Sequence, residues 1–162
     1  MVKSCSKIKT KEAIKKLIIN LKKRGKKIAF TNGCFDILHY GHVKYLEDAK
    51  RCADILVVAI NDDNSVKRLK GKKRPVFKLR DRMRMVAALE SIDYVTWFKE
   101  DTPKEVIEYL KPHILIKGAD YKIRDIVGND VVRSYGGSVK RIRYIKGYSV
   151  TSIINRIARR FS

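Results

Sequence analysis

Apolar residues along the chain follow two patterns, short continuous runs and longer stretches with helical spacing. The runs predict strands of a parallel sheet, because a strand covered on both faces is apolar throughout. The helically spaced stretches predict amphipathic helices, beginning with a leading helix over residues 10–25. Strands and helices alternate, which predicts a parallel α/β sandwich. Strands are expected at 28–30, 55–60, 94–98, 114–116 and 139–145, and helices at 10–25, 42–52, 79–91, 103–110 and from 147 onward.

Polar residues follow several of the predicted strands directly. Thr31, Asn32 and Gly33 come after the first strand, Asn61 and its neighbour after the second, and a lysine–glycine pair after the fourth at Lys117. Ligands of open α/β sheets bind at this carboxyl edge. Gly33 allows the backbone to turn and to approach a ligand closely. The sequence therefore predicts a ligand site at this edge of the sheet.

Two histidines, His39 and His42, stand where the first helix after this edge begins, with Gly41 between them. A helix start offers free N–H groups and a positive dipole end, which together suit a phosphate. Two histidines three positions apart are often ordinary surface or packed residues. Their place after a strand's carboxyl end favours a functional pair here.

The stretch 31–42 reads Thr-Asn-Gly-Cys-Phe-Asp-Ile-Leu-His-Tyr-Gly-His. Its last four residues resemble the HxGH signature of the nucleotidylyltransferase superfamily. The whole stretch is similar to the heptose 1-phosphate adenylyltransferases of ADP-heptose synthesis. Further matching blocks lie at 68–76, 82–95, 100–103, 117–121 and 135–139.

The resemblance covers about residues 10–157 and implies a Rossmann-like three-layer α/β sandwich with a five-stranded parallel sheet. It implies one nucleotidylyltransferase domain over 1–162, with the leading helix in 1–25 and the catalytic core in 26–157. Two departures from the family pattern stand out. Val150 replaces a usual hydroxyl in a Ser-Thr-Thr run, and Ala119 replaces a frequent glycine.

The reaction that the resemblance implies is transfer of a nucleotidyl group from ATP to a sugar 1-phosphate. The expected catalytic residues are His39, His42 and Lys44. The expected nucleotide-binding residues are Thr31, Asn32, Gly33, Cys34, Phe35, Asp36, Gly41, Lys117, Gly118, Asp120, Ser149, Val150 and Thr151, and the expected substrate or phosphate contacts are Asn61, Asp62, Lys70, Arg74 and Arg82. Asp36 is expected to line the nucleotide and to organise a histidine or a metal-bound water. For the polar residues outside the two strongest motifs, the alternative is a solvated side chain or a helix cap.

The formal net charge is +21, from 38 basic and 17 acidic residues. Such a balance is typical of nucleic-acid binding. A triphosphate and a sugar phosphate are polyanions too, and aromatic residues are not interleaved with the basic runs, so nucleic acid is not expected as the main partner. The basic stretch 66–76 is interpreted as a mobile loop that folds over the triphosphate, or alternatively as a solvated charge run.

Mg²⁺ is expected to accompany ATP without direct protein ligands, because it neutralises triphosphate oxygens and needs few protein groups. Three cysteines in no metal-ligand spacing indicate reduced thiols and a cytoplasmic protein, and Cys34 is interpreted as a packing residue. No apolar run approaches the ~20 residues that span a bilayer, and the first residues lack the apolar core of a signal peptide.

The family resemblance further implies a homodimer and a sugar kinase on a separate protein, since no kinase segment is present in the chain. Two alternatives stay open. One is a CTP-dependent cytidylyltransferase for a polyol phosphate such as glycerol 3-phosphate. The other is an RNA-binding protein that uses the same fold.

Overall fold

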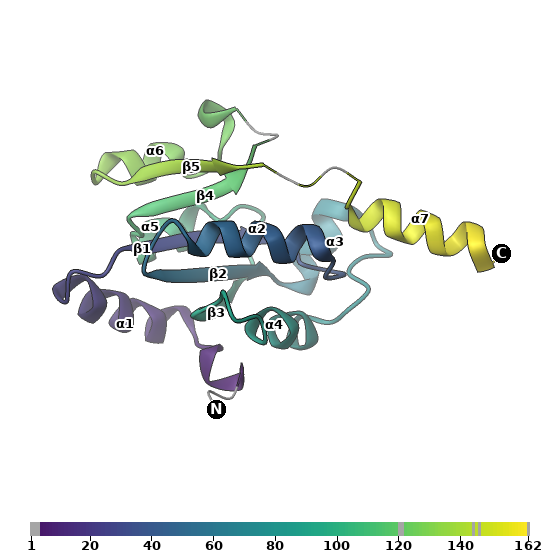
Figure 1. Cartoon of the computed structure of the whole chain (residues 1–162), viewed down its shortest axis with the longest axis horizontal. Helices are drawn as coiled ribbons and strands as arrows, with labels where there is room; N and C mark the ends of the chain where they lie inside the picture. Colours follow the sequence, from purple (N-terminus) through teal and green to yellow (C-terminus); the bar gives the residue numbers. More distant parts are fainter. Residues whose placement is uncertain (1–3, 120–121, 144, 146, 162) are drawn as a thin grey trace.

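The computed structural model describes residues 4–119, 122–143, 145 and 147–161, and within them five parallel strands form one sheet (Figure 1). The strand order is β3-β2-β1-β4-β5. The strands are β1 (Ile28–Gly33), β2 (Ile55–Asn61), β3 (Tyr94–Phe98), β4 (Ile114–Gly118) and β5 (Ser138–Ile142). The helices are α1 (Lys11–Lys23), α2 (Tyr40–Lys50), α3 (Asp63–Lys70), α4 (Leu79–Ala87), α5 (Lys104–Leu110), α6 (Asn129–Ser134) and α7 (Val150–Phe161), with 3-10 turns at Ser4–Lys7 and Ile123–Asp125.

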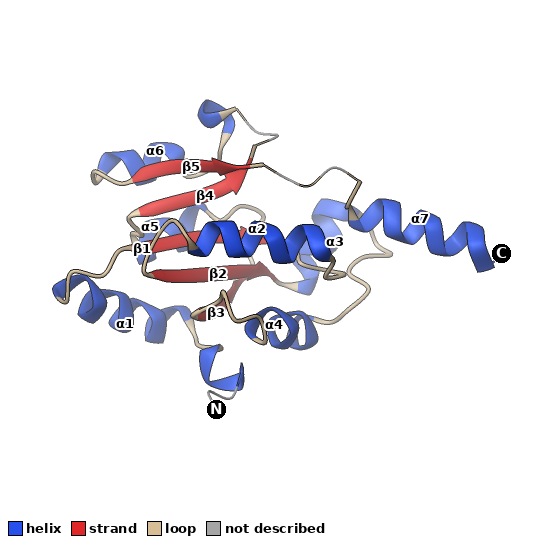
Figure 2. Cartoon of the chain, in the orientation of Figure 1, coloured by secondary structure: helices blue, strands red, loops and turns tan. Residues whose placement is uncertain are grey.

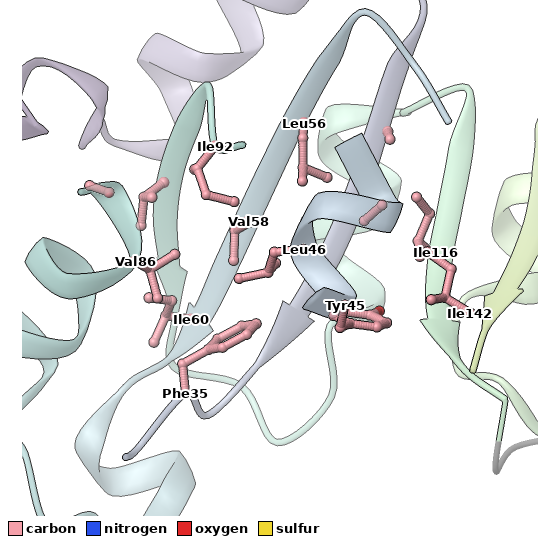
Figure 3. Packing of buried hydrophobic residues seen from close by; sticks show 14 of the residues in the cluster. Phe35, Tyr45, Leu46, Leu56, Val58, Ile60, Val86, Ile92, Ile116 and Ile142 are labelled. Atoms are coloured by element: carbon pink, nitrogen blue, oxygen red, sulfur yellow. The ribbon is translucent and has the colours of Figure 1, made fainter. Parts of the chain in front are cut away.

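Helices cover both faces of the sheet and make three layers (Figure 2). On one face, α2 and α4 pack against the strands through a buried cluster that includes Leu46, Val58 and Val86 (Figure 3). On the other face, α1, α5 and α6 bury a second cluster that includes Ile14, Phe30 and Ile107. Each strand therefore contributes apolar side chains in both directions, which explains why the sequence shows continuous apolar runs. The predicted Rossmann-like α/β fold is confirmed.

The stretch 66–76 is the largest departure from the predicted elements. Its first half is helical: α3 runs from Asp63 to Lys70, and the side chain of Asp62 caps it by accepting the Ser65 N–H at 2.7 Å. Ser65 and Val66 are buried, so α3 belongs to the packed body. The prediction of a continuous mobile loop was wrong, and the irregular connection is confined to residues 71–78.

Helix α7 stands apart from the other helices. It leaves the body after β5 and projects away from the sheet (Figure 1). None of its residues is buried, and Ile157 and Phe161 are exposed. Its N-terminus is therefore the part of α7 that lies nearest the sheet's carboxyl edge.

Candidate active site

The strand order places the predicted site at a topological switch point. From β1 the chain moves through β2 to β3 on one side, and then returns to β4 on the other side of β1. Ligands of such sheets bind in the crevice where the two directions diverge. The Lys117 side chain of β4 donates a hydrogen bond to the amide oxygen of Asn32 in β1 and so bridges this point. Gly118 is buried at the carboxyl end of β4.

The loop between β1 and α2, residues 34–39, is held by packing against the core. Phe35 has a left-handed φ of 46°, which turns the chain, and its ring is buried beneath the loop (Figure 3). A Cβ on Gly33 would stand 3.1 Å from that ring, so the close approach favours glycine. Thr31 is buried as well, with its hydroxyl 2.8 Å from the hydroxyl of Tyr45. These contacts therefore fix the loop that leads into His39 and His42.

His39 and His42 lie face to face at the start of α2. Their rings are stacked with centroids 3.8 Å apart and planes 18° from parallel. His39 caps the helix, because its Nδ1 accepts the backbone N–H of His42 at 3.3 Å. The ring of Phe35 lies 5.3 Å from that of His42 on the core side. Both predicted catalytic histidines are therefore brought together.

Gly41 permits this arrangement. A Cβ at this position would stand 2.9 Å from the Cβ of Tyr148 and 3.1 Å from Nδ1 of His39. Tyr148 also approaches the ring of His39, with centroids 6.1 Å apart, and that of Tyr40 at 5.7 Å. Sequence reasoning missed Tyr40 and Tyr148, although one lies inside the histidine motif and the other directly precedes Ser149. Because Gly41 has no side chain, the ring of Tyr148 can lie beside His39.

Both histidines are neutral at pH 7. Burial lowers the pKa of His42 to about 4, and the neighbouring His39 acts in the same direction. Burial also lowers the pKa of His39. Because Nδ1 of His39 accepts a backbone N–H, the network assigns its proton to Nε2, which is then a hydrogen-bond donor. Nδ1 of His42 has no hydrogen-bond partner among the described residues.

Asp36 makes contacts that differ from those predicted. Its buried carboxylate pairs with Nε of Arg74 and accepts the N–H groups of Val76, at 2.7 Å, and Phe77, at 3.2 Å. Arg74, Val76 and Phe77 all belong to the connection between α3 and α4. The expectation that Asp36 organises a histidine or a metal-bound water is therefore corrected: Asp36 organises a neighbouring loop.

Arg82, predicted as a phosphate contact, is fully buried. Its guanidinium donates to the carbonyl of Phe77 at 3.0 Å, to the carbonyl of Cys34 at 2.6 Å, and to the carboxylate of Asp63 at 2.7 Å. With each nitrogen committed to protein, the side chain does not face the site's solvent. In this structure Arg82 instead joins three segments around the site.

Three other predicted contacts also have partners within the protein. Lys44 pairs with Asp48 one turn further along α2, at 2.5 Å. Asn61 is buried and donates to the hydroxyl of Ser65 at 3.0 Å, and Asp62 caps α3. Lys44 is therefore engaged along the surface of α2, Asn61 is bonded inside the protein, and Asp62 serves as a helix cap.

The remaining cations and the thiol lie beside the loop. Burial raises the pKa of the Cys34 thiol, while the nearby charges of Lys70 and Arg74 oppose that effect. The thiol is therefore protonated at neutral pH, as expected for a packing residue. Lys70 is exposed at the end of α3, and Arg74 is half-buried against Asp36.

A family model described as cytidylyltransferase-like matches residues 30–156 of this chain. The match includes the stacked histidines, the switch point and the start of α7. The chain belongs to the cytidylyltransferase-like family. The family predicted from the sequence motifs is thereby confirmed.

The relatives of this cytidylyltransferase-like chain are similar over nearly all of it. The bifunctional protein HldE of Pelobacter propionicus is 52% identical over 98% of this chain and 33% of its own length. The bifunctional protein HldE of Marinomonas sp. is 58% identical over 82% of this chain and 28% of its own length. The chain thus spans about a third of the length of the curated relatives it matches.

A solved structure supports the fold of this cytidylyltransferase-like chain independently. The crystal structure of the lipopolysaccharide core biosynthesis protein from Thermoplasma volcanium is 29% identical, with a TM-score of 0.63. It covers 77% of this chain and all of its own.

The N-terminus of α7 supplies the last predicted residues of the cytidylyltransferase-like site. Ser149 caps the helix: its hydroxyl accepts the Ser152 N–H at 3.0 Å, and its own N–H donates to the Ser152 hydroxyl at 3.2 Å. Val150 is half-buried and Thr151 is exposed. Ser149 therefore has the capping role that was the alternative to phosphate binding. Asp120, also predicted, lies outside the described residues.

The described residues contain no group of three or more His, Cys, Asp or Glu side chains that could hold a metal ion. In the same part of the chain, no helix combines the length and apolarity needed to cross a bilayer.

Proposed function

We propose that this chain transfers an adenylyl group from ATP to D-glycero-D-manno-heptose 1-phosphate, giving ADP-heptose and pyrophosphate. The observation that carries the proposal is the His39–His42 stack at the helix start, placed at the sheet's switch point. The choice of sugar rests on the heptose-type motifs over 31–42 and 117–121 and on about 50% identity to HldE proteins.

The chemistry needs little from the protein beyond placement and charge. A phosphate monoester has a second pKa near ~6, so the sugar phosphate is mostly a dianion at neutral pH and needs no general base. One of its oxygens attacks the α-phosphorus of ATP in line. The bond from that phosphorus to the bridging oxygen breaks, and pyrophosphate leaves. Catalysis then consists of alignment and of stabilising charge on the phosphates.

The neutral histidines suit this task as hydrogen-bond donors. Nε2–H of His39 is available because Nδ1 is occupied by the helix cap. His42 is held against it and, in the proposed mechanism, meets the same phosphates. The free N–H groups at the start of α2 add donors of fixed direction. Lys70 and Lys117, near the loop and at the switch point, supply positive charge.

Mg²⁺ enters this proposal with ATP. We propose that phosphate oxygens of ATP hold the ion, because Mg²⁺ needs few protein ligands. When bound, Mg²⁺ neutralises phosphate charge. The protein's own part is to orient the phosphates through the histidines and the helix N-terminus.

The proposal extends to the chain's surroundings. We propose a cytoplasmic enzyme that works as a homodimer and receives its sugar 1-phosphate from a sugar kinase. The kinase supplies the acceptor because adenylyl transfer requires a phosphate on the sugar's anomeric oxygen.

Pyrophosphate release with each of ATP, CTP, GTP and UTP tests the proposal, with Mg²⁺ and heptose 1-phosphate present. The expected result is fastest turnover with ATP, and no release when the sugar phosphate is omitted. A hexose 1-phosphate serves as the matched acceptor, since it lacks only the seventh carbon's contacts. Faster turnover with CTP would instead support a cytidylyltransferase, and silence with all four would reject the proposed reaction.

A further inference from the structure

Two charged side chains without direct access to solvent converge on one stretch of irregular chain beside the histidines. Asp36 is 1% exposed and Arg82 is 0% exposed. Asp36 comes from the loop after β1, and Arg82 comes from α4. Both bond to residues 74–77, which connect α3 to α4: Asp36 pairs with Arg74 and accepts two backbone N–H groups, and Arg82 donates to the Phe77 carbonyl. We call this pair the Asp36–Arg82 clamp.

The far ends of the clamp are anchored in the site itself. Arg82 also binds the carbonyl of Cys34 at 2.6 Å and the carboxylate of Asp63 at 2.7 Å, at the start of α3. Buried charges are costly unless paired and hydrogen-bonded, and here the bonds meet that requirement. Hydrogen bonds and ion pairs therefore connect the loop after β1, the start of α3 and residues 74–77.

Burial of apolar side chains does not explain why residues 74–77 keep their place. Val76 is 53% exposed and Phe77 is 41% exposed, so both side chains stand in solvent while their backbone N–H groups point to Asp36. The polar contacts of the clamp therefore hold residues 74–77 in place, as apolar packing holds the segments of the core.

The held segment carries positive charge. The N–H of Arg74 donates to the carbonyl of Gly71 at 3.0 Å and closes a turn whose central residues are Lys72 and Lys73. We call residues 71–74 the cationic turn. Lys72 and Lys73 are exposed, and the turn's last residue is fastened to the loop that leads into the histidines. The charge of Arg74 reaches that loop, since it acts on the pKa of the Cys34 thiol.

We propose that Asp36 and Arg82 are positioning residues that hold the cationic turn beside the histidine pair, so that Lys72 and Lys73 meet the phosphates of a bound triphosphate. This inference rests on the proposed function, because it needs a triphosphate at the histidines. In this proposal the cationic turn increases the affinity for ATP, and the clamp fixes the position of the turn.

Calorimetric titration with ATP and Mg²⁺ tests the ligand half without relying on turnover. Lys72→Ala/Lys73→Ala changes two exposed side chains and is expected to raise the Kd for ATP by about tenfold, which corresponds to the loss of a charge-assisted contact. Asp36→Ala is expected to raise it at least as much. Asp101→Asn is the matched control, because Asp101 pairs with Arg68 in an exposed ion pair outside the clamp. An unchanged Kd in the double lysine variant would overturn the proposal.

Amide hydrogen exchange tests the clamp half. In the wild type, the N–H groups of Val76 and Phe77 are expected to exchange slowly, while Lys72 and Lys73 exchange fast. Asp36→Ala removes the acceptor and should release both protected amides, whereas Asp36→Asn keeps an oxygen in place and should restore part of the protection and part of the ATP affinity. Lys72→Ala/Lys73→Ala should leave the exchange unaltered. Rapid exchange of Val76 and Phe77 in the wild type would contradict the clamp.

The two proposals fail in different ways. If the wild type binds ATP through the cationic turn but releases no pyrophosphate with heptose 1-phosphate, the proposed reaction is rejected and the clamp is kept. Normal turnover by the wild type, together with an unchanged Kd for ATP in the double lysine variant, would keep the reaction and reject the role of the cationic turn in ATP binding.

Discussion

His39 and His42 differ in how their ring nitrogens are committed. Nδ1 of His39 is occupied by the helix cap, while Nδ1 of His42 is buried without a partner among the described residues. An unsatisfied buried polar atom costs free energy, and such atoms gather at functional sites. The two rings therefore differ, because Nδ1 of His39 serves the helix cap whereas Nδ1 of His42 is enclosed by protein.

Replacing His42 with alanine tests this division of labour. The fold should persist, since the helix cap belongs to His39, while kcat should fall by about 100-fold, the usual result of losing one donor to a developing charge. Steady-state kinetics together with circular dichroism measure both effects. The control is His113→Asn, because His113 lies at the opposite end of β4 and its Nδ1 accepts the Ile28 N–H, a role that asparagine can keep. A His42→Ala enzyme with wild-type kcat would refute the catalytic role.

The lowered pKa of His42 also predicts how stability depends on pH. The pKa of His42 is about 4 in the folded protein against an ordinary value of 6.5, so between these pH values the unfolded chain binds more protons. The free energy of unfolding should therefore fall as the pH drops from 7 to 4, by up to about 3 kcal/mol from this residue. Denaturant unfolding of wild type and His42→Gln at several pH values isolates the difference. Parallel pH curves for the two proteins would show that His42 is not desolvated.

At the scale of elements, helix starts at the sheet's carboxyl edge serve two purposes. The caps of α2, α3 and α7 come from His39, Asp62 and Ser149. α2 and α3 bury side chains against the body, whereas α7 buries none. Loss of a cap is therefore expected to lower the stability of the whole protein in α2 or α3, but only the local stability of the helix in α7.

The variants Asp62→Ala and Ser149→Ala form a matched pair for this expectation. Loss of the Asp62 cap should lower the global free energy of unfolding by about 1 kcal/mol, because α3 is part of the packed body. Loss of the Ser149 cap should leave the global value unchanged and instead speed amide exchange at Ser152, since α7 can fray alone. Equal global losses in both variants would mean that α7 is packed more firmly than its exposure indicates.

For the whole molecule, local patterns predicted most of the fold. The apolar runs located all five strands of the described sheet, and the histidine motif located the switch point. The start of α3 was missed, because Lys and Arg dominate residues 67–74 and hide a cap at Asp62. The roles of Asp36 and Arg82 were also missed, since their partners are backbone groups and charges tens of residues away. Such contacts leave no periodic signal in a sequence.

The charge of the whole molecule also takes on a more specific meaning in the structure. Of the 38 basic residues, Lys70, Arg74 and Lys117 lie around the site, and Lys72 and Lys73 belong to the cationic turn. Exposed lysines and arginines elsewhere supply a general positive field that attracts phosphate-bearing molecules. A basic net charge and a small-molecule site are thus compatible in one chain.

The most direct test of adenylyl transfer follows the α-phosphate. ATP labelled at that position is incubated with heptose 1-phosphate, Mg²⁺ and either wild-type protein or His42→Ala, and the products are separated by chromatography. We expect the label to appear in a sugar nucleotide with the wild type, in an amount equal to the pyrophosphate released, and only slowly with His42→Ala. Label that stays in ATP, or leaves as free AMP without a sugar nucleotide, would contradict it.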